Sequence, residues 1–317
     1  MSEKKFDLVA LGDCNVDVST LLTSYPSSGG CAFGEQGGVL PGGTAVNTAI
    51  AAARLGLKVA VITAVGRDEY GRAVRKLLQS EGVETEFIKE FDEPTGNVFI
   101  AIEPSGEHTF FCLRLHCADW QLGERDVPLD LISRSRAVYA SGVAVAEAGM
   151  VKPSATAVLA ALRHAREVGV PTFFDPNLRM DTPQIAPEIA RELGACIRNA
   201  DFYLPNQSEF NSLILSDCNA PTSGLKGTVI KQGTHGCTVM ELLTKKHIPA
   251  ISVEAVDTTG AGDSFNAGFI AGFLSTGQIE SAAKLGSIVA GITVSRVGTM
   301  SAFPSESDIK SYAWDLG

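Results

Sequence analysis

Short apolar runs alternate with longer helical segments along most of the chain, and this alternation limits the possible fold more than any other feature. Phe6 to Leu11 and Lys58 to Ala64 have the apolar character of buried strands. An Ala-rich helical segment, Thr44 to Leu55, lies between them, and a second helix, Tyr70 to Glu81, follows with Asp68 as a suitable N-cap. Strands that alternate with helices over short connections form parallel sheets through right-handed crossovers. The pattern therefore predicts an α/β fold.

The alternation is interrupted between about Phe87 and Leu122. Asn97 to Glu103 and His108 to Leu113 flank a Pro104-Ser105-Gly106 turn, a pattern typical of an antiparallel hairpin. The segment from Ser19 to Gly43 is rich in Ser and Gly. We expect the hairpin, together with Ser19 to Leu40, to form a small β lid.

Beyond Trp120 the alternation resumes and continues to the end of the chain. The expected strands are Ala137–Ser141, Pro171–Phe174, Phe202–Leu204, Val229–Lys231, Cys237–Leu242 and Ile248–Val253. The expected helices are Ser154–Val168, Ile185–Asn199, a short helix starting near Gln207, Asp263–Leu274 and Glu280–Ser295.

Composition and charge narrow the class of protein. Of the 317 residues, 45% are hydrophobic and 20% charged, which excludes a disordered chain. The 26 Lys and Arg against 36 Asp and Glu give a net charge of -10, which disfavours a nucleic-acid partner. The seven cysteines never form C-x-x-C spacing, which disfavours a zinc or redox site. No apolar run approaches about 18 residues, and Met1 to Lys5 lead directly into a strand, so we expect no membrane span, no signal peptide and a cytoplasmic location.

The most informative stretch is Asp257 to Gly268, which places a glycine-rich turn between a strand and a helix. Such a turn offers backbone N–H groups and the positive end of a helix dipole to an anion. A carboxylate beside an anion is unfavourable unless it has a chemical task, and Asp263 stands at the head of this helix. Two interpretations follow: Asp263 caps the helix, or it accepts a proton from a hydroxyl that attacks phosphorus.

Two segments far apart in the chain resemble the signatures of one enzyme family. The stretch DTTGAGDSFNAGF from Asp257 to Phe269 resembles the second signature of the ribokinase-like (PfkB) sugar kinases, and GGTAVNTA from Gly42 to Ala49 looks like the first. The sequence has no Walker A loop and no G-x-S-x-G. The resemblance implies a single ribokinase-like three-layer domain over residues 1–317, with a mainly parallel central sheet, helices on both faces and a β lid formed by about 14–43 and 87–122.

The resemblance also implies ATP-dependent phosphorylation of a sugar or sugar-acid hydroxyl. Asp263 is the implied general base, and Gly260, Ala261 and Gly262 form the implied turn that stabilises charge on the transferred phosphoryl group. Glycines before a helix let sugar hydroxyls approach the backbone, and an Asn amide offers a donor and an acceptor to a diol. The implied acceptor-binding residues are Asn15, Asp17, Gly42, Gly43 and Asn47.

The remaining implied residues surround the nucleotide and its ions. Glu209 is implied to organise Mg²⁺ through water, and Asp257 and Thr259 are implied to hold a monovalent cation such as K⁺. A helix cap with a first-turn acid is the alternative interpretation of the N-x-x-E segment from Asn206 to Glu209. The implied ATP-binding residues are Arg179, Asn206, Lys231, Gly233 and Gly236.

Several alternatives remain open. The acceptor is of the ribose, fructose or 2-keto-3-deoxygluconate type, or it is a nucleoside, and a non-catalytic sugar-binding regulator would have the same fold. Arg114 is a candidate to meet a sugar acid or a sugar phosphate and Trp120 to stack on a ring, but packing of the lid is the favoured interpretation of each. A small sheet with one apolar face needs a cover, so we expect a homodimer through the lids.

Overall fold

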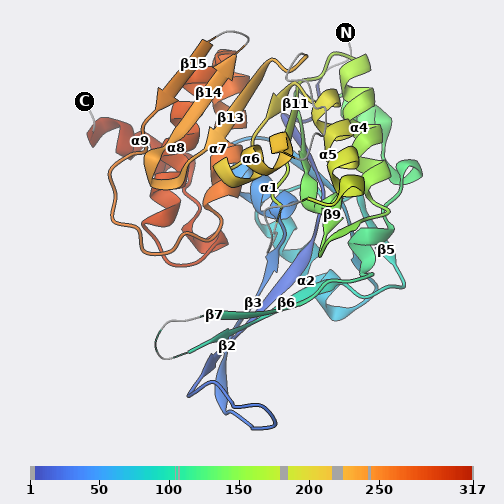
Figure 1. Ribbon diagram of the computed structural model, residues 1–317, viewed down its shortest axis with the longest axis vertical. Helices are drawn as coiled ribbons and strands as arrows, with labels where there is room; N and C mark the ends of the chain where they lie inside the picture. The colour runs from blue at the N-terminus through green and yellow to red at the C-terminus, as the bar shows by residue number, and fades with distance from the viewer. Residues whose placement is uncertain are drawn as a thin grey trace.

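The computed structural model describes residues 4–103, 105, 108–178, 185–215, 224–241 and 244–315. Within these residues, a nine-stranded sheet with helices on both faces forms the body, and a four-stranded sheet projects from it (Figure 1). The predicted three-layer α/β architecture with a β lid is confirmed.

The large sheet is mainly parallel, as predicted. Its strand order is β15-β14-β13-β12-β11-β8-β1-β4-β5. Every neighbouring pair from β5 to β13 is parallel, whereas β13 with β14 and β14 with β15 are antiparallel. The strands are β1 (Leu8–Leu11), β4 (Val59–Gly66), β5 (Ile88–Phe91), β8 (Val138–Ser141), β11 (Thr172–Asp175), β12 (Phe202–Tyr203), β13 (Gly227–Lys231), β14 (Cys237–Glu241) and β15 (Thr244–Ile248).

Two apolar cores lie on opposite faces of this sheet because strand side chains alternate between faces. Leu8 and Ala10 of β1 belong to the core under α1, α7 and α8, whereas Val9 and Leu11 belong to the core under α4 and α5. Among the described helices, none has the length and apolar character that crossing a membrane requires. The helices are α1 (Thr44–Arg54), α2 (Glu69–Ser80), α3 (Leu129–Ser133), α4 (Ala155–Glu167), α5 (Pro187–Asn199), α6 (Gln207–Leu215), α7 (Ala261–Thr276), α8 (Ile279–Val294) and α9 (Glu306–Asp315).

The lid is a twisted sheet of order β3-β2-β6-β7 that extends away from the body (Figure 1). The predicted hairpin is present, since β6 and β7 pair antiparallel, and β2 joins β6 in parallel and β3 antiparallel. The lid thus combines two distant parts of the chain, as expected. Its strands are β2 (Asn15–Leu22), β3 (Gly34–Gly42), β6 (Gly96–Ile102) and β7 (His108–Leu113).

Two predicted segments are wrong in detail. The strand expected at Ile248–Val253 instead ends at Ile248, because Pro249 has no N–H for the sheet ladder. The strand of this region is the polar edge strand β15, whose Lys and His side chains are exposed. The lid was expected to include residues from 87, yet β5 pairs in parallel with β4 of the large sheet.

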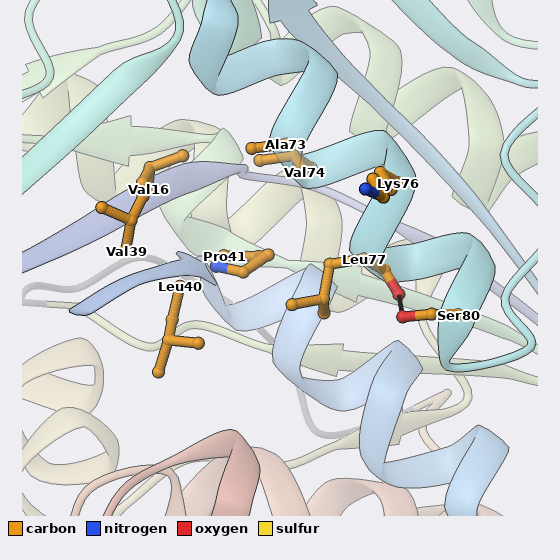
Figure 2. A pocket seen from close by; sticks show the side chains of 9 residues that line it. All are labelled: Val16, Val39, Leu40, Pro41, Ala73, Val74, Lys76, Leu77 and Ser80. Carbon is orange, nitrogen blue, oxygen red and sulfur yellow. Dashed lines mark hydrogen bonds between the residues drawn. The ribbon is translucent and has the colours of Figure 1, made fainter.

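An apolar groove of about 280 Å³ marks the junction between lid and body. Figure 2 shows Val16 of β2 and Val39 and Pro41 of β3 on one side of it, and Val74 and Leu77 of α2 on the other. The nine side chains that line this groove include none of the implied site residues. The groove is therefore a feature of the lid's root and not of the candidate site.

Helices α7 and α8 approach closely because small residues lie between them. A Cβ at Gly268 would lie 2.8 Å from Val289 Cγ2, and one at Gly272 would lie 2.8 Å from the Ala282 Cα. Side chains at these two positions would push the helices apart. The close contact holds α7 against the body, and with it the glycine turn at the start of α7.

An aromatic cluster fastens α7 to the sheet. Phe173 of β11 stacks on Phe202 of β12 with ring centres 4.9 Å apart, and it forms a T-shaped contact with Phe269 of α7 with ring centres 5.9 Å apart. Phe173 is fully buried. The position of the first turn of α7 therefore depends on the packing of these aromatic rings farther along the helix.

We expect a Phe173→Ala variant to lose about 3–5 kcal/mol of unfolding free energy, since it leaves a cavity in this cluster. Urea unfolding followed by circular dichroism measures the change. Val168→Ala, at a position 44% exposed, is the control and should change stability by less than about 0.5 kcal/mol. Equal losses in the two variants would contradict the packing account.

Candidate active site

Four polar side chains lie where the parallel strands end, and one of them, Lys231, is an implied site residue. Asp13 follows β1, Ser141 ends β8, Asp175 ends β11 and Lys231 ends β13. Side-chain contacts join these ends: Ser141 Oγ donates to Asp13 Oδ1 at 2.8 Å, and Lys231 Nζ donates to Asp175 Oδ2 at 2.8 Å. In open α/β sheets, ligands bind outside the carboxyl ends of the strands. The site therefore lies where this architecture favours one.

Asp263 lies in the first turn of α7 and is buried, with 8% of its surface exposed. Asn47 Nδ2 of α1 donates a hydrogen bond to Asp263 Oδ2 at 2.8 Å. Burial raises the pKa of Asp263 to about 7, against the opposing effect of the Asn47 hydrogen bond, and the charges of Asp175 and Asp13 add to the rise. A carboxyl group with this pKa can gain or lose a proton near neutral pH.

The turn before Asp263 depends on Gly260. Gly260 is the N-cap of α7 and has φ 76°, in the left-handed region that favours glycine. A Cβ there would also lie 2.7 Å from Thr299 Cγ2 and 2.9 Å from Phe303 Cε1. The first-turn amides of Ala261, Gly262 and Asp263 lie where a helix lacks intrahelical acceptors, the arrangement that binds anions.

The implied acceptor residues come together at the root of the lid. Asn15 Nδ2 donates to Asp17 Oδ1 at 2.6 Å, and a Cβ at Gly42 would lie 2.6 Å from Asp17 Oδ2 and 2.7 Å from Asn15 Nδ2. The buried Oδ1 of Asn47 has no hydrogen-bond partner within the part of the chain that the structure describes. Buried polar atoms are almost always paired, so this oxygen is suited to a ligand hydroxyl.

Asp13 is a residue that the sequence did not single out. Its carboxylate accepts hydrogen bonds from the Thr44 amide at 2.9 Å and the Ala45 amide at 3.4 Å, at the start of α1. Gly43 has φ 104°, and a Cβ there would lie 2.6 Å from the Asp13 carbonyl oxygen. Asp13 therefore holds the glycine pair and α1 against the end of β1. Its position two residues before Asn15 was the available signal.

The Lys231 side chain lies between Asp175 at the end of β11 and Gly262 of the glycine turn. Besides contacting Asp175, its Nζ lies 3.4 Å from Asn266 Oδ1, and Asn266 Nδ2 donates to Asp175 Oδ2 at 2.5 Å. Lys231 Nζ is also 3.7 Å from the position of a Cβ on Gly262. The sequence implied a role for Lys231 but missed Asp175 and Asn266. Arg179, four residues after Asp175 in the segment Asp175-Pro176-Asn177-Leu178-Arg179, lies outside the described residues.

Asn206 and Glu209 form a reciprocal cap at the start of α6. Asn206 Oδ1 accepts from the Glu209 amide, and Glu209 Oε2 accepts from the Asn206 amide, both at 2.8 Å. Glu209 Oε1 also accepts from the Leu178 amide at 2.8 Å. Burial raises the pKa of Glu209 to about 7, and the charge of Asp175 adds to this. Asn206 and Glu209 therefore cap α6, as the alternative interpretation predicts. The Glu209 carboxylate also lies close enough to Asp175 for the charge of Asp175 to raise its pKa.

Asp257 and Thr259 form a turn beside the glycine segment. The Thr259 amide donates to Asp257 Oδ1 at 2.9 Å, and the Gly298 amide donates to Asp257 Oδ2 at 3.0 Å. The carboxylate thus ties the glycine turn to the loop after α8.

A cavity of about 460 Å³ opens beside the glycine turn, between α7, α8 and the loop after β15. Gly236 has φ 86°, and a Cβ there would lie 2.1 Å from the Ile248 carbonyl oxygen, so the turn that borders the cavity requires glycine. The size and mostly apolar lining suit a nucleoside. Its lining comprises Lys231, Gly233, Thr234, Gly236, Ala250, Ile251, Ser252, Val253, Ala255, Thr258, Ala261, Gly262, Phe265, Ser287, Ala290, Gly291 and Val294.

The lid residues Arg114 and Trp120 are both buried. Arg114 Nη1 donates to Asn15 Oδ1 at 2.5 Å, and the Trp120 ring lies beside Lys152, whose Nζ is 5.0 Å from the ring centre. Burial, together with the neighbouring charge of Asp119, raises the pKa of the Cys117 thiol, so this cysteine is not activated. Neither aromatic stacking on a ligand nor thiolate chemistry fits these side chains.

Comparison with known proteins identifies the family of this chain. A family model described as pfkB family carbohydrate kinase matches residues 5–306. The chain belongs to the pfkB family of carbohydrate kinases. Members of this family are phosphotransferases that act on a hydroxyl group, so the chain is a sugar kinase.

Individual relatives of this kinase are distant. Fructokinase-2 of Oryza sativa subsp. japonica is 29% identical over 305 residues, covering 90% of this chain and 89% of the relative. The 5-dehydro-2-deoxygluconokinase of Listeria monocytogenes serovar 1/2a is 29% identical over 321 residues, covering 98% and 96%. A putative ribokinase II from E. coli, solved with ATP and Mg²⁺, has a TM-score of 0.84 at 22% identity, covering 99% of this chain and all of that one.

The two ends of α7 offer a matched test of the glycine turn. Gly260 and the C-cap Gly277 both have positive φ, but a Cβ at Gly277 meets nothing within 4 Å. Gly277→Ala should cost about 1 kcal/mol of stability from backbone strain, whereas Gly260→Ala should cost more and abolish MgATP binding measured by calorimetry. Equal effects on MgATP binding would contradict a role for the Gly260 turn.

Proposed function

We propose that this sugar kinase transfers the γ-phosphoryl group of ATP to a hydroxyl of a sugar or a sugar acid, with Asp263 as the general base. The observation that supports this most is the position of one buried carboxylate, Asp263, between the glycine turn and the acceptor-binding residue Asn47. Asp263 follows the glycine turn at the head of α7, and Asn47 of the acceptor side holds it at 2.8 Å. A carboxylate beside bound phosphate is unfavourable unless it accepts a proton during the reaction.

In the proposed reaction the acceptor hydroxyl gives its proton to Asp263 as its oxygen bonds to the γ-phosphorus. The bond from the γ-phosphorus to the oxygen that bridges to the β-phosphate breaks, and ADP leaves. Amides of the Gly260–Gly262 turn stabilise the charge on the transferred group, and Lys231 adds a positive charge nearby. Closure of the lid would exclude water, the competing acceptor.

Mg²⁺ would be held on the side of Asp175 and Glu209 and would neutralise phosphate charge. Within the described ranges no cluster of three or more acidic, His or Cys residues could hold a metal by itself, so water and phosphate oxygens must complete its shell. These oxygen donors fit an ion that keeps several waters. We further propose that Asp257 and Thr259 help to hold K⁺ beside the turn, and that the reaction takes place in the cytoplasm.

Asn15, Asp17, Asn47 and the backbone at Gly42 and Gly43 would orient the acceptor. The names of the relatives support a fructose-like or a dehydro-deoxygluconate-like acceptor equally. A nucleoside acceptor is less well supported, because the buried Trp120 lies against Lys152 and offers no exposed face for a base. The glycine turn and Asp263, both in place, argue against a regulator without turnover.

An Asp263→Asn variant should lower kcat by about 100-fold or more, because the amide keeps the shape and removes the base. ADP release with MgATP and a panel of pentoses, hexoses, sugar acids and nucleosides measures this. Calorimetry should show that MgATP still binds. Asp130→Asn, an exposed acid far from the site in sequence, is the control. Near-normal turnover of Asp263→Asn would refute the assignment of the base.

The pH dependence of kcat should show one acidic limb. Because the carboxylate is the active form and burial raises the pKa of Asp263 to about 7, kcat should fall as the pH drops through about 7 and reach a plateau above about 8. The pKa of Glu209 is also raised to about 7, so the same profile measured in a Glu209→Gln variant, where the limb should persist, separates the two groups. A limb near pH 4, the ordinary carboxyl range, would show that Asp263 is not tuned as proposed.

We also propose a homodimer through the lids. Several large apolar side chains of the lid are exposed, and Phe111 at 47% and Leu113 at 60% lie on its edge strand β7. Exposed apolar clusters on a sheet favour a protein partner. Light scattering should give twice the 33.3 kDa chain mass, and Phe111→Asp with Leu113→Asp should give single chains. A monomeric wild-type protein would contradict the dimer.

A further inference from the structure

Two cations and two carboxylates form a buried ring beside the acceptor residues, and Arg114 Nη2 also lies 3.9 Å from Asp13 Oδ2 outside this ring. Arg114 Nε lies 2.6 Å from Glu147 Oε1, and Arg114 Nη2 lies 3.1 Å from Asp119 Oδ2. Lys152 Nζ lies 3.0 Å from Asp119 Oδ2 and 3.1 Å from Glu147 Oε2. Each cation therefore contacts both carboxylates. The exposed fraction of the side chains is 5% or less, except for 15% at Glu147.

The ring joins the lid to the body. Arg114 directly follows the lid strand β7, and Asp119 lies in the short helical turn of residues 118–121. Glu147 ends β9 (Ala146–Glu147), and Lys152 follows β10 (Met150–Val151), the hairpin after β8 of the large sheet. The Trp120 ring covers Lys152, with the ammonium 5.0 Å from the ring centre.

One member of the ring reaches the acceptor site. Arg114 Nη1 donates to Asn15 Oδ1 at 2.5 Å, and Asn15 Nδ2 donates to Asp17 Oδ1 at 2.6 Å. The guanidinium fixes the amide oxygen of Asn15, so the amide nitrogen must point to Asp17. Arg114 thereby sets the orientation of the two side chains that pack against Gly42, where a Cβ would lie 2.6 Å from Asp17 Oδ2 and 2.7 Å from Asn15 Nδ2.

Lys152 balances the charge of this ring. Without it, the carboxylates of Asp119 and Glu147 would share Arg114 alone in a buried site, where an uncompensated charge is costly. Without Lys152, the two carboxylates would attract the Arg114 guanidinium more strongly. This attraction would draw the guanidinium away from Asn15. We propose that Lys152 is a positioning residue for acceptor binding: by neutralising Asp119 and Glu147 it leaves Arg114 in place to orient Asn15 and Asp17. This rests on the proposed function, in which Asn15 and Asp17 hold the acceptor.

Steady-state kinetics of Lys152→Met, which keeps the length of the side chain and removes its charge, tests the proposal. We expect the acceptor KM to rise by about 10-fold or more while the KM for MgATP stays within about 2-fold. Adding Glu147→Gln to this variant restores charge balance and should bring the acceptor KM back at least halfway on a logarithmic scale. Lys226→Met, which removes a mostly exposed partner of Asp201, is the control and should leave both constants unchanged.

Three results would overturn the proposal. The first is an unchanged acceptor KM in Lys152→Met, and the second is an equal rise of both KM values, which a merely structural role would produce. The third is a double variant as impaired as the single one. If Lys152→Met does not fold, Arg114→Lys keeps the charge and removes the fork that holds Asn15, and an unchanged acceptor KM there would also overturn it.

The proposed function can fail separately, and the ring can still be tested. If the wild-type protein releases no ADP with any acceptor, the phosphotransfer proposal is wrong. Calorimetry then measures the binding of the sugars of the same panel to the wild-type protein and its variants, in place of the kinetic measurements. Weaker sugar binding in Lys152→Met with recovery in the double variant would support the positioning role, and unchanged binding would refute it.

Discussion

The hydrogen bond between Asn47 and Asp263 is the contact on which the rest of the site depends. It joins the first turns of α1 and α7, 216 residues apart in the sequence, at a distance of 2.8 Å. Below this contact, glycines at the α7–α8 interface and the Phe173 cluster hold α7 in place. This hydrogen bond joins the proposed acceptor site, to which Asn47 belongs, to the glycine turn proposed to bind phosphate, which Asp263 follows.

Charge compensation separates Asp263 from Asp119, a buried acid at the root of the lid. Burial alone would raise the pKa of Asp119, but Arg114 and Lys152 hold it below its usual value. The direct contact of Asp263 is the Asn47 amide, and neither this hydrogen bond nor the charge of Lys231 outweighs burial, so the pKa of Asp263 rises to about 7. A paired acid serves to fix geometry, whereas a buried acid without a cation beside it can exchange a proton.

The sequence predicted what depends on local pattern. Glycine turns at two helix starts predicted local structure, and the resemblance of these two segments to the family signatures indicated Gly42, Gly43, Asn47, Gly260 and Asp263 as site residues. The alternation predicted the parallel sheet, although the polar strand β15 was missed because an exposed edge strand has no apolar run. These features follow from neighbours in the chain.

What the sequence could not predict depends on distant partners. Lys152, Glu147 and Asp119 look like ordinary surface residues in the sequence, and only the fold places them with Arg114 in one buried ring. Likewise, Asp13 acquires its role from the start of α1, 31 residues later. A charged side chain can be buried when its counterion is in place, and no local pattern records that counterion.

The most direct test of the account is the pH dependence of kcat in an Asn47→Ala variant, with both substrates saturating. The Asn47 hydrogen bond lowers the pKa of Asp263 against the effect of burial, so its removal should move the acidic limb of kcat to higher pH than in the wild-type enzyme. A limb that moves upward would identify Asp263 as the titrating base. A limb that stays in place would show that another group controls the reaction, and the central claim would be wrong.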